Sequence, residues 1–247
     1  AVRQARKILT LAVIEATIKT TPANDITSIL PTTPTTHRAR IEARELPRLL
    51  ADIKGYKGHS AVKIGLLLLA HTFVRVSELV TAEWHEIDFN REIWTIPAHK
   101  MKMAREHVVP LTPQVISLLN ELKQINGGKS SYLFYNPETG SHYTRASLTN
   151  ALHRLGYKGK MTSHGFRGLA STTLHNIGQR HEIIELQLAH MTGNAVSRAY
   201  NSAQQLLDRR KLMLKWSAYL NEQENKHHGN VIAFTADRNL SDAIASH

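Results

Sequence analysis

The chain has 247 residues, 42% of them hydrophobic, which is enough for a folded domain with a sizeable core. Its longest apolar run, residues 64–70, is far shorter than the roughly 20 residues of a membrane span, so no membrane association is predicted. Cysteine is absent, which excludes disulfides and thiolate metal sites and favours a reducing compartment such as the cytoplasm. Lysine and arginine number 31 against 20 acidic residues, and the net charge of +11 favours a polyanionic partner such as nucleic acid.

The first 37 residues combine a helical pattern with a linker. Residues 1 to about 19 carry apolar side chains at helical spacing, which predicts one amphipathic helix. Residues 20–36 are rich in threonine and proline, and Pro22, Pro31 and Pro34 exclude a long regular element. Because one helix cannot bury its own apolar stripe, we expect residues 1–37 to be the remnant of a separate helical domain plus a linker. We see no targeting peptide and expect an N-terminally trimmed fragment.

The main domain is predicted to begin at Arg38 and to be mostly helical. The predicted helices cover residues 45–53, 60–73, 113–124, 144–155, 163–177, 182–188 and 204–220. The second of these contains four consecutive leucines, residues 66–69, and is expected at the centre of the core. Thr112 and Pro113 are typical of a helix start.

Between residues 86 and 111 the pattern changes to three short β-like segments, 86–89, 92–96 and 107–111. They predict a small three-stranded antiparallel sheet, so the fold class is α+β, mainly α, with residues 38–220 as one domain. Residues 221–247 are expected to form a C-terminal tail. Residues 231–234 within it could form a short strand or a docking segment.

Two arginines in the main domain are candidates for binding an anion. Arg75 directly follows the apolar helix, and because an unpaired buried guanidinium is very costly, it must reach water or meet a negative group. Glu78, three residues further on, is positioned to orient it. His164 and Arg167 are three residues apart at a predicted helix start, so both can address one phosphate beside the N–H groups of that helix.

Further residues could transfer protons or act as a nucleophile. Lys100 and Lys102 lie in the connection between the second and third predicted strands, and the local sequence does not decide between them. His190 and Tyr200 follow, with a turn between them. A tyrosine has an ordinary pKa of about 10, so it needs positive charge or a base nearby to act as a nucleophile. Together with the arginines, these residue types could attack a phosphodiester without a metal.

In this order the residues resemble the catalytic domain of a tyrosine recombinase, an integrase of the phage and genomic-island type. The strings that carry the resemblance are Thr72-Phe73-Val74-Arg75, Ser77-Glu78-Leu79, Met101-Lys102-Met103, His107-Val108-Val109-Pro110-Leu111, Ser163-His164-Gly165-Phe166-Arg167, Gln187-Leu188-Ala189-His190 and Ala199-Tyr200-Asn201. Each string is short, but their order and spacing are specific, and they cover residues 38–220.

The resemblance implies site-specific recombination of a mobile element through a 3′-phosphotyrosyl intermediate. It implies that Tyr200 attacks the scissile phosphate, that Arg75 and Arg167 stabilise the transition state, and that Lys102 protonates the leaving oxygen. By the same resemblance His164 assists proton transfer at the tyrosine, His190 binds the phosphate, and Glu78 supports the arginines. The residues that we expect to contact DNA elsewhere are Lys100, Arg105, Arg145, Lys158 and Lys160.

The partners implied are double-stranded DNA attachment sites in a bacterial or phage nucleoid, with accessory DNA-bending or directionality factors. The resemblance implies a homo-tetramer on DNA, with a monomer as the alternative for the isolated fragment. Two other functions remain open from sequence: a type IB topoisomerase, and a DNA-binding protein of the same fold without the chemistry. Neither a cofactor nor a metal is predicted. Residues 127–130 resemble the end of a phosphate loop, but Lys123 stands where that motif needs its first glycine, and residues 181–185 end in Glu185 where a zinc-binding helix needs histidine.

Overall fold

The computed structural model describes the backbone of residues 2–21, 39–190 and 202–244. It describes the side chains of these residues except at 2–3, 202–203 and 227–244. The chain divides into two compact units, Ala1–His37 and Arg38–His247. The first contains helix α1 (Val2–Ile14), which ends earlier than predicted because Ala16 adopts a left-handed φ of 56°. The N–H of Thr17 then bonds Ala12 O at 2.9 Å, which closes the helix end. Ile8, Leu11 and Ile14 on α1 are exposed.

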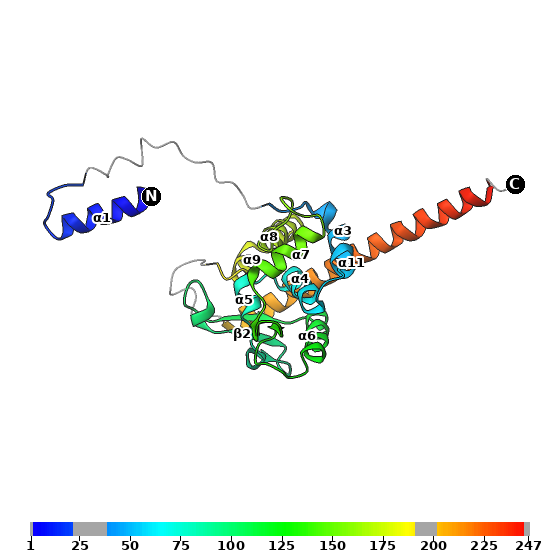
Figure 1. The fold of residues 1–247 in the computed structure, drawn as a ribbon, viewed down its shortest axis with the longest axis horizontal. Helices are drawn as coiled ribbons and strands as arrows, with labels where there is room; N and C mark the ends of the chain where they lie inside the picture. Colours follow the sequence, from blue (N-terminus) through cyan, green and yellow to red (C-terminus); the bar gives the residue numbers. More distant parts are fainter. Residues whose placement is uncertain (1, 22–38, 191–201, 245–247) are drawn as a thin grey trace. The chain divides into compact units, whose positions relative to one another are not determined.

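The second unit holds the remaining elements, and Figure 1 shows its helices gathered around α4. Its helices are α3 (Leu46–Lys54), α4 (Ser60–Thr72), α5 (Val76–Val80), α6 (Pro113–Asn126), α7 (Arg145–Arg154), α8 (Gly165–Asn176), α9 (His181–Gln187) and α11 (Ser202–Ile244). Short 3-10 turns occur at Ala43–Glu45, Trp84–Glu86 and Ala98–Lys100. Most of the predicted helices are confirmed within a few residues, but α5 was not predicted. No helix in the described ranges has the length and apolar character of a membrane span.

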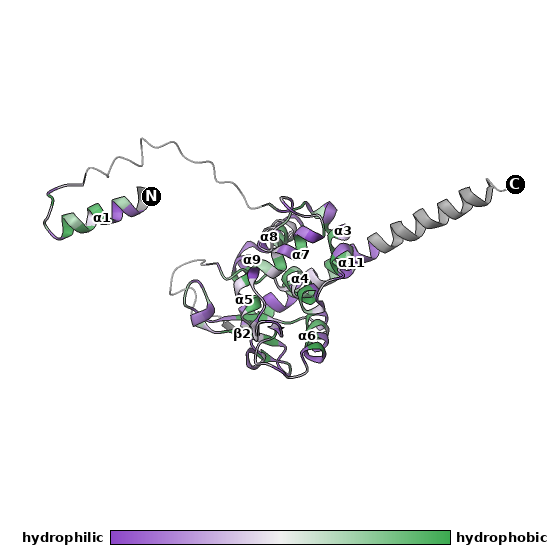
Figure 2. Ribbon diagram, viewed as in Figure 1, coloured by the Kyte–Doolittle hydropathy of each residue, from purple (hydrophilic) through white to green (hydrophobic). Residues whose placement is uncertain are grey.

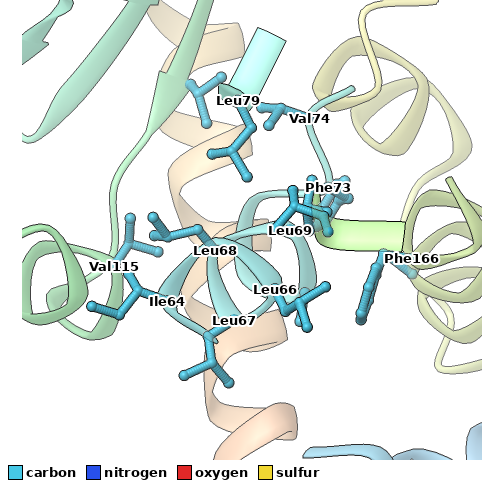
Figure 3. Packing of buried hydrophobic residues seen from close by; sticks show 14 of the residues in the cluster. Ile64, Leu66, Leu67, Leu68, Leu69, Phe73, Val74, Leu79, Val115 and Phe166 are labelled. Atoms are coloured by element: carbon cyan, nitrogen blue, oxygen red, sulfur yellow. The ribbon is translucent and has the colours of Figure 1, made fainter. Parts of the chain in front are cut away.

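The core is built around α4, whose side chains are apolar on every face and almost all buried. Figure 3 shows Ile64 close to Val115 of α6, and Phe166 of α8 near the other end of α4. In Figure 2 the apolar colouring of α4 contrasts with the mixed colouring of the outer helices. Gly65 allows this packing, because a Cβ there would lie 2.9 Å from Leu148 of α7. The prediction of a central core helix is therefore confirmed.

The predicted three-stranded antiparallel sheet is also confirmed, with slightly shorter strands. It consists of β1 (Ile87–Asp88), β2 (Ile93–Ile96) and β3 (His107–Pro110), in the order β1-β2-β3. The register pairs Trp94 with Val109 and Ile96 with His107. A second, unpredicted hairpin joins β4 (Tyr135–Asn136) to β5 (Ser141–His142). The mainly α, α+β class is as predicted.

Helix α11 is longer than predicted and packs across the core. Trp216 donates from its indole Nε1 to Ala70 O at 2.8 Å, and Glu224 pairs with Lys54 of α3 at 2.7 Å. The helix passes without a break through residue 220, where the pattern placed the start of a tail. Residues 231–234 are helical, so the short strand considered from sequence is wrong. A strand needs a partner for its backbone groups, whereas extending a helix satisfies them locally.

Candidate active site

Arg75 stands between the core helix and the short helix α5. Phe73 ends α4 with a left-handed φ of 40°, which turns the chain so that Arg75 becomes the N-cap of α5. The Arg75 guanidinium donates to Glu78 Oε1 at 2.7 Å, and its backbone N–H donates to Glu78 Oε2 at 2.8 Å. Glu78 is buried, with its side chain 2% exposed, while that of Arg75 is 19% exposed. Glu78 therefore holds both the helix end and the arginine side chain.

Arg167 lies buried at the point where three helices meet. Its Nη1 donates to Phe73 O at 2.6 Å and its Nη2 donates to Leu188 O at 2.6 Å. Phe73 is the C-cap of α4 and Leu188 is the C-cap of α9, so carbonyls at two helix C-terminal ends accept hydrogen bonds from one guanidinium. Such ends carry partial negative charge and suit a buried cation. The Nε–H and one Nη1–H of Arg167 keep no hydrogen-bond partner among the described residues, and they remain able to bind an anion.

His190 completes this cluster from the end of α9. Its Nε2 lies 3.3 Å from Arg167 Nη2, and its Nδ1 lies 2.8 Å from Glu185 Oε2. Because the guanidinium can only donate, this network assigns the neutral histidine its proton on Nδ1, directed at Glu185. The imidazole is about half exposed, so one edge of the cluster faces solvent. The structure thus brings Arg75, Arg167 and His190 together.

The electrostatics of the cluster favour an anion. Burial, followed by the positive charge of Arg75, lowers the pKa of Arg167 to about 10, while Glu78 and Glu185 oppose that shift. Arg167 remains protonated at neutral pH despite this shift. Two cations held close together in a poorly hydrated site repel each other, and a phosphate between them would relieve that repulsion. This arrangement can stabilise negative charge that develops on a phosphorus centre.

His164 is the residue before α8, three positions ahead of Arg167, and its side chain is exposed. The turn that presents it requires glycine at the next position. A Cβ on Gly165 would lie 2.8 Å from Met161 Sδ and 2.9 Å from Ala39 O. The backbone N–H of Gly165 also bonds Thr162 Oγ1 at 3.0 Å. His164 and Arg167 therefore lie at the same helix start, where His164 is exposed and Arg167 is buried.

The structure distinguishes the two lysines that the sequence left open. Lys100 donates to Thr81 O at 2.8 Å, to Glu83 Oε1 at 2.7 Å and to Glu86 Oε1, so its three ammonium hydrogens are engaged. Lys102 is exposed on the β2–β3 connection and makes no hydrogen bond or ion pair with another described residue. Only Lys102 of the two has an ammonium that can meet a substrate, which argues against the DNA contact expected of Lys100.

The remaining predicted residues are distributed as follows. Tyr200 lies outside the described residues. Arg105 is exposed beside Lys102, Arg145 is the first residue of α7, and Lys158 and Lys160 are exposed in the turn that follows α7. All four are accessible to a DNA backbone. In the described part of the chain, no group of three His, Asp or Glu side chains is arranged to hold a metal ion.

Two buried residues near the cluster were not identified from sequence. Arg209 of α11 donates to Val108 O of β3 at 2.7 Å. His107, the first residue of β3, is buried, and burial followed by the charge of Arg209 lowers its pKa to about 3, with smaller effects from Arg167 and Arg75. Strand alternation could have revealed His107, because Val109 and Leu111 lie on the same face and are buried. No sequence pattern distinguishes Arg209 from its neighbour Arg210.

Comparison with known proteins identifies the family. The model of the phage integrase family matches residues 39–206, so this chain belongs to the phage integrase family. The integrase of Enterobacteria phage P4 is 36% identical over 236 residues, a match that covers 89% of this chain and 54% of that protein. The prophage integrase IntA of Escherichia coli K12 is 34% identical over 177 residues, covering 72% of this chain and 43% of that protein. The chain spans about half the length of the curated relatives it matches.

Solved structures support the same fold. The Tn1549 transposon integrase, in complex with circular intermediate DNA, aligns with a TM-score of 0.62 at 16% identity, covering 84% of this chain and 72% of that one. A lambda integrase dimer bound to a COC′ core site aligns with a TM-score of 0.57 at 15% identity, covering 81% and 55%. The resemblance to a tyrosine recombinase catalytic domain is confirmed at the level of family and fold.

Proposed function

We propose that this chain is the catalytic part of a site-specific DNA recombinase that exchanges strands through a tyrosine-linked intermediate. The observation that carries the proposal is the clustering of Arg75, Arg167 and His190 where α4, α8 and α9 meet. Unpaired guanidinium N–H groups and an exposed histidine edge at that point suit the non-bridging oxygens of a phosphodiester. Membership of the phage integrase family supports DNA as the substrate.

In the proposed reaction, Tyr200 Oη attacks the scissile phosphorus and the bond from phosphorus to the 5′-oxygen breaks. Lys102 donates a proton to that oxygen, His164 receives the tyrosine proton, and the two arginines stabilise the charge of the pentavalent transition state. The 3′-phosphotyrosyl bond conserves the energy of the broken bond, so a 5′-hydroxyl from a second DNA strand can reverse the reaction. Exchange of strands between two sites follows without a nucleotide cofactor.

The proposal extends to organisation and partners. Residues 38–220 form the catalytic domain, and residues 1–37 are the end of a preceding helical domain and its linker. The exposed apolar side chains of α1 and the division of the chain after His37 support that proposal. The DNA partner is a pair of attachment sites of a mobile element, on which the recombinase assembles as a homo-tetramer in the bacterial cytoplasm.

The direct test is capture of the covalent intermediate. A pool of duplexes carrying a nick near a randomised centre is incubated with the chain, denatured with detergent and separated on a gel. The wild-type chain should give a DNA–protein adduct whose DNA shares a recoverable sequence and whose peptide maps to Tyr200. Tyr200→Phe should give none. An adduct that persists in this variant, or no adduct from folded wild-type chain, would falsify the proposal. Sequence-independent relaxation of supercoiled DNA would instead favour a type IB topoisomerase.

A further inference from the structure

A largely buried polar cluster outside the arginine site surrounds Lys100. Its ammonium contacts the side chains of Glu83 and Glu86 and the main-chain oxygen of Thr81. Glu86 also accepts from the indole Nε1 of Trp94 at 2.9 Å. The Lys100 side chain is 12% exposed, and that of Glu86 is 2% exposed. Burial alone would lower the pKa of Lys100, but the bonds and charges of the two glutamates outweigh it and raise that pKa.

This cluster joins two segments that both lead to the candidate active site. Thr81 is the C-cap of α5, and Arg75 is the N-cap of the same five-residue helix. Lys100 ends the 3-10 turn that opens the β2–β3 connection, two residues before Lys102. A contact between Lys100 and Thr81 therefore connects the Arg75 helix to the segment that presents Lys102. Arg75 and Lys102 each lie a few residues from this contact, so the position of one side chain relative to the other depends on the Lys100–Thr81 hydrogen bond.

The backbone is anchored immediately before Lys102, whereas the Lys102 side chain is exposed. Met101 is buried in the core, and its carbonyl accepts from the N–H of Ala104 at 3.0 Å, which closes a turn with Lys102 at its first central position. Ala104 has a left-handed φ of 48°. The Lys102 side chain projects from this anchored turn with no partner in the described structure. An anchored backbone and an exposed ammonium suit a residue that meets its substrate only in the reactive complex.

We propose that Lys100 is a positioning residue for Lys102, because it locks the β2–β3 connection to the helix that begins at Arg75. The inference rests on the proposed function, in which Lys102 protonates the 5′-oxygen as its bond to phosphorus breaks. Lys100 itself touches no substrate, since its three N–H groups bind Thr81, Glu83 and Glu86. Its loss should therefore resemble loss of the general acid rather than loss of DNA contacts or of the arginines.

A change of leaving group distinguishes loss of the general acid from loss of DNA contacts or of the arginines. In a DNA strand whose scissile bridging 5′-oxygen is replaced by sulfur, the bond from phosphorus to sulfur breaks and a thiolate leaves. A thiol has an ordinary pKa of about 8.5, far below that of an alcohol, so the thiolate departs without receiving a proton. A defect in general-acid catalysis then disappears. Defects in nucleophilic attack, phosphate binding or DNA affinity persist, because those steps do not depend on the leaving atom.

The experiment compares covalent adduct formation on oxygen and sulfur versions of one duplex recovered from the randomised pool. Lys102→Ala should slow the oxygen substrate by about 10²- to 10⁴-fold and restore near wild-type rates with sulfur. Lys100→Met should slow the oxygen substrate by about 10- to 100-fold, as expected for a displaced catalytic group, and should likewise be restored by sulfur. Arg167→Lys should form the adduct slowly on both the oxygen and the sulfur substrate. Lys129→Met is the matched control and should behave as wild type, because this lysine is exposed and forms no ion pair with another described residue.

A second variant tests whether a loss of activity in Lys100→Met reflects misfolding. Lys100→Met leaves two glutamates without their cation, so the triple variant Lys100→Met, Glu83→Gln, Glu86→Gln removes the same lysine without stranding charge. It should show the same sulfur rescue. If Lys102→Ala is rescued but both Lys100 variants stay slow on sulfur, or both match wild type on oxygen, the positioning role is wrong. If Lys102→Ala is not rescued, the assignment of Lys102 as the acid fails, and absence of any wild-type adduct contradicts the proposed function itself.

Discussion

Arg167 donates a 2.6 Å hydrogen bond to the main-chain oxygen of Phe73, the residue that ends α4 in a left-handed conformation. A left-handed non-glycine residue is strained, and here the strain turns a carbonyl of the core helix toward the buried guanidinium. The central helix and the buried guanidinium of Arg167 are therefore linked directly. Changes in either should affect both stability and chemistry.

Arg167→Lys should impair the protein although it preserves the charge. A lysine nitrogen cannot span the carbonyls of Phe73 and Leu188 while still addressing a phosphate. We expect adduct formation to fall about 10²- to 10³-fold and the free energy of unfolding to fall on the order of 2–4 kcal/mol. Adduct kinetics and urea melts check the two effects. Arg145→Lys, at an exposed position, should leave the urea midpoint unchanged, and equal midpoints for all three proteins would contradict the anchoring role.

Trp216→Ala should be strongly destabilising. The indole is buried, its N–H satisfies Ala70 O near the end of α4, and its ring meets Phe73 edge to face at 6.0 Å. Loss of a buried tryptophan costs about 3–5 kcal/mol, so a large fall in the urea midpoint is expected. Trp216→Phe keeps most of the apolar contact but leaves the carbonyl unpaired, and it should cost about 1–3 kcal/mol. A smaller loss for alanine than for phenylalanine would refute this account of the α4–α11 contact.

Stability should decrease on acidification below neutral pH. Burial first, then the charge of Lys54, lowers the pKa of His71 to about 4, and burial and Arg209 lower that of His107 to about 3. Both folded-state values lie below the ordinary 6.5, so the unfolded chain binds more protons as the pH falls from 6.5 toward these values. The stabilisation from the neutral histidines is complete above pH 6.5 and is lost progressively below it, at about 1.4 kcal/mol per pH unit for each group.

Urea melts from about pH 7 down to about pH 4 measure this loss. His71→Gln and His107→Gln each remove one buried titrating group and should flatten the decline, even if they lower stability at pH 7. His71 is contacted by Ser217 of α11, whose hydroxyl lies 3.3 Å from its Nδ1 and can bond a glutamine instead. Parallel pH profiles for the variants and the wild type would show that neither histidine controls acid sensitivity.

DNA binding should depend steeply on salt. Each phosphate contact made by a lysine or arginine contributes about −0.9 to the slope of log affinity against log salt. Arg145→Ala, Lys158→Ala and Lys160→Ala should each weaken binding to all sequences and reduce the slope by about one. Lys129→Ala is the control, because that lysine lines a surface hollow with Ser60, at the end of α4 opposite Phe73. Fluorescence anisotropy over a salt series measures the slopes, and an unchanged slope in the three variants would exclude these residues as contacts.

Much of the fold could be predicted from local patterns. The four leucines of α4 predicted a buried helix, and the short β-like segments between residues 86 and 111 predicted the three strands. Local sequence patterns failed to predict helix ends and short helices that depend on one residue's conformation or on a single side-chain contact. Helix α1 stops at the left-handed Ala16, α5 exists because Glu78 caps it, and α11 continues through a segment with a strand-like composition.

For the site, the sequence by itself determined which residue types were available and in what order, and the strings around Arg75, Lys102, His164, Arg167, His190 and Tyr200 carried the resemblance to the family. Only the tertiary structure decided which of them meet. Arg167 and Phe73 are joined across 94 positions, and Lys100 and Thr81 across 19. Lys100 and Lys102 are alike as sequence, and burial among two carboxylates separates the anchoring lysine from the exposed one. Such contacts arise from packing between elements distant in the chain, which no local pattern records.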